Sequence, residues 1–70
     1  MTTARRELLQ LLGDISEHDG DLRLGQLVTN LATLARGANV EAIWDSEDDE
    51  LTLAARTLLA KYQQRKESAA

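Results

Sequence analysis

Three segments of this 70-residue chain repeat their apolar residues with the period of an α-helix, and this pattern constrains the fold most strongly. The first stripe consists of Leu8, Leu11, Leu12 and Ile15. Two later stripes are Leu24, Leu27, Val28, Leu31, Leu34 and Ala35, and then Leu51, Ala55, Leu58, Leu59 and Tyr62. Each stripe covers only one face of its helix, so each helix needs the others to bury it.

The residues around the stripes predict where the helices begin and end. We expect helices over about residues 3–17, 22–36 and 46–64, with a frayed tail over 65–70. Asp21 is placed to cap the second helix, because a carboxylate accepts hydrogen bonds from the first amides. Gly37 is a typical helix stop.

Ser46 and Asp49 fit a capping box at the start of the third helix. Ser46 also resembles the pantetheine-bearing serine of carrier proteins, but the acidic residues that follow it favour a plain cap.

The sequence therefore predicts an all-α fold, a small three-helix bundle forming a single domain. The connector between the second and third helices, ANVEAIWD, is irregular and unusually apolar. We expect its Val40, Ile43 and Trp44 side chains to fold back and cover one end of the core.

The chain contains no cysteine and one histidine, His18, which excludes a disulfide framework and a Cys/His zinc site. Stability must then come from helix packing, from self-association or from a partner. A homodimer that buries the remaining leucines, such as Leu9, Leu22 and Leu53, is one alternative.

Catalysis is not expected, and neither is a cofactor. His18 lies at a helix end, where the helix dipole favours a cation. No cysteine, no Ser-His-Asp order and no glycine-rich phosphate-binding loop accompanies it.

The net charge of −4 argues against direct binding to nucleic acid, which requires many cations to neutralise phosphates. The third helix also opens with acids, which phosphate would repel. No apolar run is long enough to span a bilayer, so we expect a cytoplasmic protein without membrane contact.

An acidic run opens the third helix and consists of Asp45, Glu47, Asp48, Asp49 and Glu50. Its spacing does not match a calcium loop, and acids in a first turn complement the helix dipole. We interpret the run as a solvated first turn, with an acidic patch for a basic partner as the alternative.

A polar row, Arg23, Gln26 and Asn30, flanks the leucine stripe of the second helix. We favour a structural role, in which Arg23 pairs with the acidic run and Gln26 and Asn30 bind the connector backbone. Gly25 would then admit Ile43 or Trp44 close to the helix. In the alternative the row is exposed and binds a partner.

The segment DLRLGQLVTNL, followed by IWDSEDDEL, resembles a group of small bacterial and phage-encoded proteins of unknown function. They share an Asp-x-Arg-x-Gly-Gln-x-x-x-Asn segment and a later aromatic segment ending in Asp-Glu-x-x-Leu. The matching positions are Asp21, Arg23, Gly25, Gln26 and Asn30, and then Trp44, Asp49 and Glu50. The resemblance implies a small helical fold and no particular activity.

The most consistent function is a non-catalytic protein–protein interaction or regulatory module with an unknown protein partner. The alternative is an acidic mimic of nucleic acid that inhibits a basic host or phage enzyme.

Overall fold

The computed structural model describes the backbone of residues 1–69 and the side chains of residues 1–65. Within this range the chain forms four helices: α1 (Thr3–His18), α2 (Leu24–Arg36), α3 (Ala42–Asp45) and α4 (Asp48–Ala69). The predicted all-α class is confirmed, and the three long helices begin within about two residues of their predicted positions. The predicted fade near residue 64 is not observed, because α4 continues to Ala69; residue 70 of the predicted tail lies outside the described residues.

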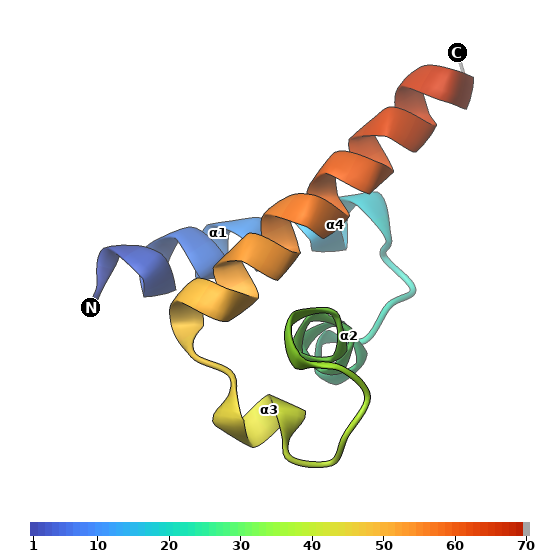
Figure 1. Ribbon diagram of the computed structural model, residues 1–70. Coiled ribbons are helices and arrows are strands. Elements are labelled where there is room, and N and C mark those ends of the chain that lie inside the picture. The colour runs from blue at the N-terminus through green and yellow to red at the C-terminus, as the bar shows by residue number, and fades with distance from the viewer. Residues whose placement is uncertain (70) are drawn as a thin grey trace.

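The helix α4 is the central element of the fold and packs against both α1 and α2 (Figure 1). Contacts join Arg5 to Asp48 near the start of the two helices and His18 to Tyr62 farther along, so α1 and α4 run in the same direction. Figure 1 shows α2 nearly end-on beneath them, so it crosses the pair steeply. The predicted three-helix bundle is therefore correct only in outline.

The core lies where α1, α2 and α4 meet. Its buried members are six residues of the predicted stripes and, in addition, Ala54: Leu8, Leu11, Ile15, Leu27, Leu31, Ala54 and Ala55. The prediction is wrong for Leu24 and Leu34, which are 60% and 48% exposed. Ala55 is fully buried, and its small side chain allows the other helices to approach α4 closely. Half-buried leucines and Tyr62 close the edge of this core.

Local hydrogen bonds explain the helix ends. Thr2 Oγ1 accepts the amide of Arg5 and begins α1. Gly37 ends α2 as predicted: it has a φ of 91° and donates its amide to the Thr33 carbonyl over 2.7 Å. The predicted cap by Asp21 is wrong, because α2 begins only at Leu24 with Arg23 in the cap position.

The predicted capping box of Ser46 and Asp49 is also wrong. The Ser46 hydroxyl donates to the Ala42 carbonyl over 2.6 Å and so closes α3 instead. At the start of α4, the Glu47 amide donates to the carboxylate of Glu50 over 3.1 Å. Asp49 accepts the amide of Glu50, so the acids of the first turn do satisfy free amides there.

Candidate functional site

The helix α3 and the turn before it carry the two most exposed large apolar side chains of the described residues. Trp44 is 90% exposed, Val40 is 91% exposed and Ile43 is 48% exposed, and we call these three residues the Trp44 surface. Ala42 is the buried member of α3, at 2% exposure. Because consecutive helical residues are about 100° apart, Trp44 faces away from the side on which Ala42 is buried.

The prediction that these side chains cover the core is therefore wrong. The helix α3 contacts α2, and a single helical turn can bury only one of its faces. The small Ala42 occupies that face, which leaves Trp44 exposed to solvent. Gly25 does not admit Ile43 or Trp44 either, since a Cβ built at Gly25 has no neighbouring atom within 4 Å.

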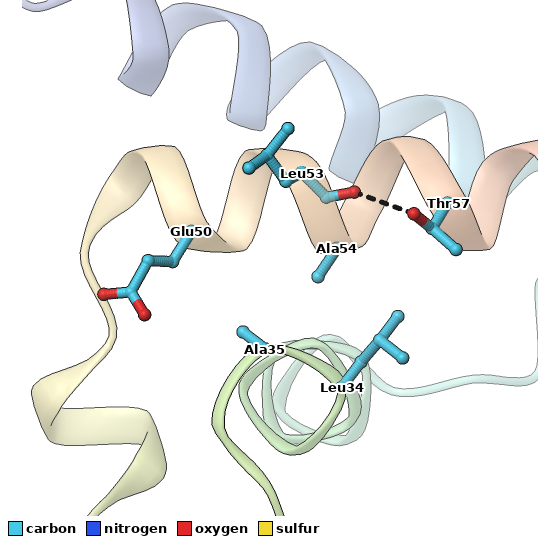
Figure 2. Close-up of a pocket in the computed structure, with 6 residues that line it drawn as sticks. All are labelled: Leu34, Ala35, Glu50, Leu53, Ala54 and Thr57. Carbon is cyan, nitrogen blue, oxygen red and sulfur yellow. Dashed lines mark hydrogen bonds between the residues drawn. The ribbon is translucent and has the colours of Figure 1, made fainter.

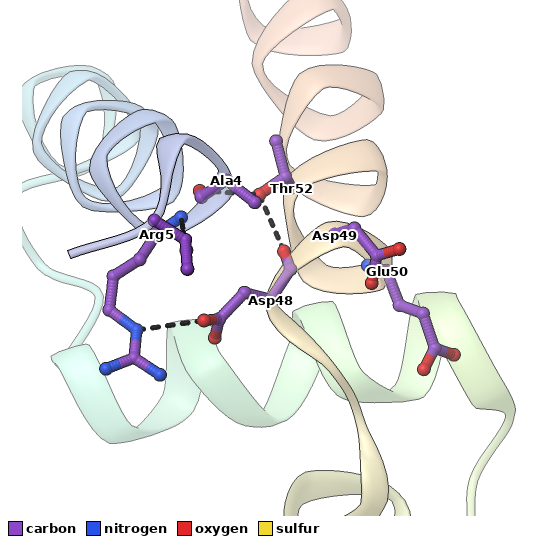
Figure 3. Close-up of polar contacts among 7 residues, drawn as sticks. Ala4, Arg5, Asp48, Asp49, Glu50 and Thr52 are labelled. Carbon is purple, nitrogen blue, oxygen red and sulfur yellow. Dashed lines mark hydrogen bonds and ion pairs between the residues drawn. The ribbon is translucent and has the colours of Figure 1, made fainter.

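The acidic run divides into paired and exposed members. Figure 3 shows Asp48 accepting a hydrogen bond from Arg5 Nε over 2.9 Å. Glu50 accepts one from Arg36 over 2.8 Å, and this hydrogen bond holds the pKa of the Glu50 carboxyl below its usual value. Asp45, Glu47 and Asp49 are exposed, so the acids nearest Trp44 remain accessible to a partner.

The polar row of α2 does not have the structural role that the sequence favoured. Arg23, Gln26 and Asn30 are all exposed. Within the described residues the ion-pair partners of the acidic run are Arg5 and Arg36, and none is Arg23.

Gln26 acts on its own helix rather than on the connector. Its side-chain Oε1 accepts the backbone amide of Arg23 over 2.9 Å, which satisfies a free amide at the start of α2. Gln26 also lines a shallow surface depression, together with Leu22, Gly25, Thr29 and Asn30. The row is thus exposed, and the partner binding of the alternative interpretation stays a prediction.

A second hollow lies between α2 and α4 (Figure 2). Its lining is mainly apolar and consists of Leu34, Ala35, Glu50, Leu53, Ala54 and Thr57. Leu34 is 48% exposed and Leu53 is 61% exposed. We call this hollow the α2/α4 groove.

Sequence reasoning missed the polar contacts between α1 and α4. Arg56 donates two hydrogen bonds to the carboxylate of Glu7, and these bonds lower the pKa of Glu7. The buried Thr52 hydroxyl lies 3.1 Å from the Ala4 carbonyl and 2.6 Å from that of Asp48 (Figure 3). Only the register of two parallel helices reveals these pairs.

A second missed cluster surrounds the single tyrosine. The Tyr62 hydroxyl donates to Asp19 over 3.2 Å, and His18 stacks on the Tyr62 ring at a centroid distance of 5.9 Å. Arg65 lies over the same ring, 5.7 Å from its centroid. Burial, followed by the hydrogen bond to Asp19, raises the pKa of Tyr62.

Two further properties follow from the side-chain positions. No group of three or more potential ligands among the described residues is arranged to hold a metal ion. Within residues 1–69, no helix combines the length and apolar character needed to cross a bilayer.

Comparison of the chain with protein-family models, with curated proteins and with solved structures gives no match. The resemblance to small bacterial and phage proteins therefore remains a prediction, and the function has to be inferred from the surface itself.

Proposed function

We propose that this chain is a non-catalytic protein-interaction module that binds a protein partner through the Trp44 surface. The observation that carries the proposal is the 90% exposure of Trp44 beside the 91% exposure of Val40. Leaving such apolar area in water is unfavourable by about 25 cal/mol per Å². A partner that covers the surface recovers this free energy, and tryptophan is the residue type most enriched where binding energy concentrates.

The charges around the surface favour a basic partner. Glu41 lies between Val40 and Ile43 in sequence, Asp45 and Glu47 follow Trp44, and all three acids are exposed. Cations around an apolar pocket on the partner would be attracted to these acids before contact, which accelerates association at low salt.

Affinity capture from the source cell, followed by binding measurements with the purified partner, tests the proposal. Trp44→Ala should abolish capture, whereas Leu9→Ala should not. Leu9 is a suitable control because it is an exposed leucine, at 52%, on α1 rather than on α3. Equal capture by both variants would contradict the proposal.

A second candidate function is imitation of nucleic acid, and the exposed carboxylates of Asp45, Glu47 and Asp49 favour it. Two of the five acids already pair with arginines of this chain, which makes the array less like a row of phosphates. The combined change Asp45→Asn and Glu47→Gln separates the candidates. It should abolish capture by a nucleic-acid-binding enzyme but only slow association with a partner held by Trp44.

The remaining expectations belong to this proposal. A module of this kind needs no cofactor and does not bind nucleic acid directly, and a cytoplasmic location is consistent with it.

A further inference from the structure

The helix α3 and the segments on either side of it form a strap, residues 37–47, at the edge of the molecule (Figure 1). Among the described helices, its main packing partner is α2. Ala42 is the buried residue of the strap, at 2% exposure, and it does not belong to the core that α1, α2 and α4 share. An alanine buries a single methyl group, so the apolar contact that holds the strap is small. The strap should therefore open more easily than the core unfolds.

Polar contacts from one residue of α2, Arg36, hold both ends of the strap. Near its start, the Asn39 side-chain amide donates a long hydrogen bond to the Arg36 carbonyl over 3.5 Å. Just beyond its end, Arg36 Nη2 donates to Glu50 Oε1 over 2.8 Å. The same Glu50 oxygen accepts the backbone amide of Glu47 over 3.1 Å. In Figure 2 the Glu50 carboxylate accordingly points away from the α2/α4 groove, toward the segment that joins α3 to α4.

Arg36 is also the cation that faces the acids at the end of the strap. The hydrogen bond to Glu50, together with the nearby charges of Asp45 and Glu47, raises the pKa of Arg36 above its usual value. Arg5, the other cation that pairs with the acidic run, reaches a different carboxylate. Without the charge of Arg36, the three acids around it would repel one another.

We propose that Arg36 is an electrostatic latch for this strap: while it holds Glu50 the strap stays against α2, and once it lets go the strap opens locally with the core still folded. The latch responds to salt, because the side chains of Arg36 and Glu50 are 40% and 32% exposed. Because the strap carries Trp44, a partner must order an open strap again, which weakens binding without removing any contact. This consequence for binding rests on the proposed function, whereas the opening is a property of the isolated chain.

Amide hydrogen exchange of the isolated protein, followed by NMR, tests the latch. The reporter amides are those of Asp45 and Ser46, which make the backbone hydrogen bonds that close α3. The amide of Ala55, a fully buried residue of α4, reports on the core. In the wild type the reporter amides should exchange faster than that of Ala55 and should not respond to low denaturant, because local opening exposes little surface. Equal protection of strap and core would overturn the proposal, since the strap would then open only when the whole chain unfolds.

Two variants separate opening of the strap from unfolding of the chain. Arg36→Gln should accelerate exchange of the reporter amides by about threefold, the effect expected for loss of an exposed ion pair. Arg56→Gln is the matched control, because it removes the exposed pair with Glu7, which stays intact while the strap opens. It should accelerate exchange at Ala55 and leave the reporter amides unchanged. Equal responses of the reporter amides to the two variants would refute the latch.

Glu50→Gln tests whether the effect belongs to the pair. Alone it should accelerate exchange of the reporter amides, but added to Arg36→Gln it should bring no further acceleration. High salt should accelerate their exchange in the wild type and not in Arg36→Gln. Additive effects of the two changes, or a salt effect of the same size in both proteins, would exclude Arg36 as the latch. These measurements need no partner, so they can fail while capture through Trp44 succeeds, and the reverse.

Discussion

The hydroxyl of Thr52 lies 3.1 Å from the carbonyl oxygen of Ala4, forty-eight positions earlier in the chain, and 2.6 Å from that of Asp48. Thr52 is also the buried polar side chain of the described core, at 4% exposure. The contact joins the first turn of α1 to the second turn of α4 and sets their register.

Replacing this hydroxyl should destabilise the protein. Thr52→Val keeps the shape and the burial but removes the donor, and we expect the free energy of unfolding to fall by about 1 kcal/mol. Chemical denaturation measures this loss of free energy, provided that the variant and the wild type have the same m-value. Thr57→Val is the matched control, because the exposed Thr57 bonds only within its own helix, and it should change stability little. Equal effects of the two changes would contradict a special role for Thr52.

The ion pair between Glu7 and Arg56 should make stability depend on acidity. The hydrogen bond from Arg56 lowers the pKa of Glu7 in the folded state below its ordinary value of 4.5. This contribution is therefore present above about pH 4.5 and is lost as the pH falls through the folded-state pKa.

Melting temperatures of the wild type and Glu7→Gln across this acid range measure that contribution. The two proteins should differ near neutral pH and converge on acidification, and added salt should reduce the difference because the pair is exposed. Glu17→Gln, at an exposed carboxylate on the same helix, serves as the matched control. A gap between wild type and Glu7→Gln that stays constant down to low pH would exclude the pair as its cause.

The single tyrosine should titrate at a higher pH than usual. Burial disfavours the charged form of Tyr62, and the hydrogen bond to Asp19 stabilises the neutral form, so its pKa lies above 10.0. The resulting stability is complete below pH 10 and is lost as the pH rises through the folded-state pKa. Ultraviolet absorbance of tyrosinate measures this directly. Asp19→Asn should lower the pKa only partly, because burial remains; titration at or below the ordinary value in the wild type would refute the contact.

Two members of the polar row should respond in opposite ways to alanine. Gln26→Ala removes the acceptor of the Arg23 amide and should destabilise the protein by about 0.5 to 1 kcal/mol. Asn30→Ala should be neutral or slightly stabilising, because Asn30 is exposed within a helix and alanine favours helix. Thermal unfolding compares the two. Comparable losses for both would mean that Asn30 has a structural partner after all.

The helices and most of the core could be predicted from the sequence, since both depend on local patterns. The stripe members Leu8, Leu11, Ile15, Leu27 and Leu31 are buried as predicted, whereas Leu24 and Leu34 are exposed. Gly37 ends α2 because only glycine adopts its φ of 91° without strain. Helix propensity and periodicity act over a few residues, so the order of amino acids alone determines them.

The candidate site could not be predicted in the same way. Trp44 was expected inside because tryptophan usually gains by burial, yet α3 is one turn long and its buried face is occupied by Ala42. Arg23 was expected to pair with the acidic run, yet Arg5 and Arg36 lie closer to it. Which cation reaches which acid depends on how helices cross, and that is a property of packing between distant segments.

The sequence by itself thus determined an all-α chain with three amphipathic helices, because helical periodicity is local. Only the tertiary structure decided that α1 and α4 run parallel with Thr52 at their contact, that α2 crosses them, and that Trp44 faces solvent. These choices follow from which faces can be buried together once Ala54 and Ala55 allow the helices to approach.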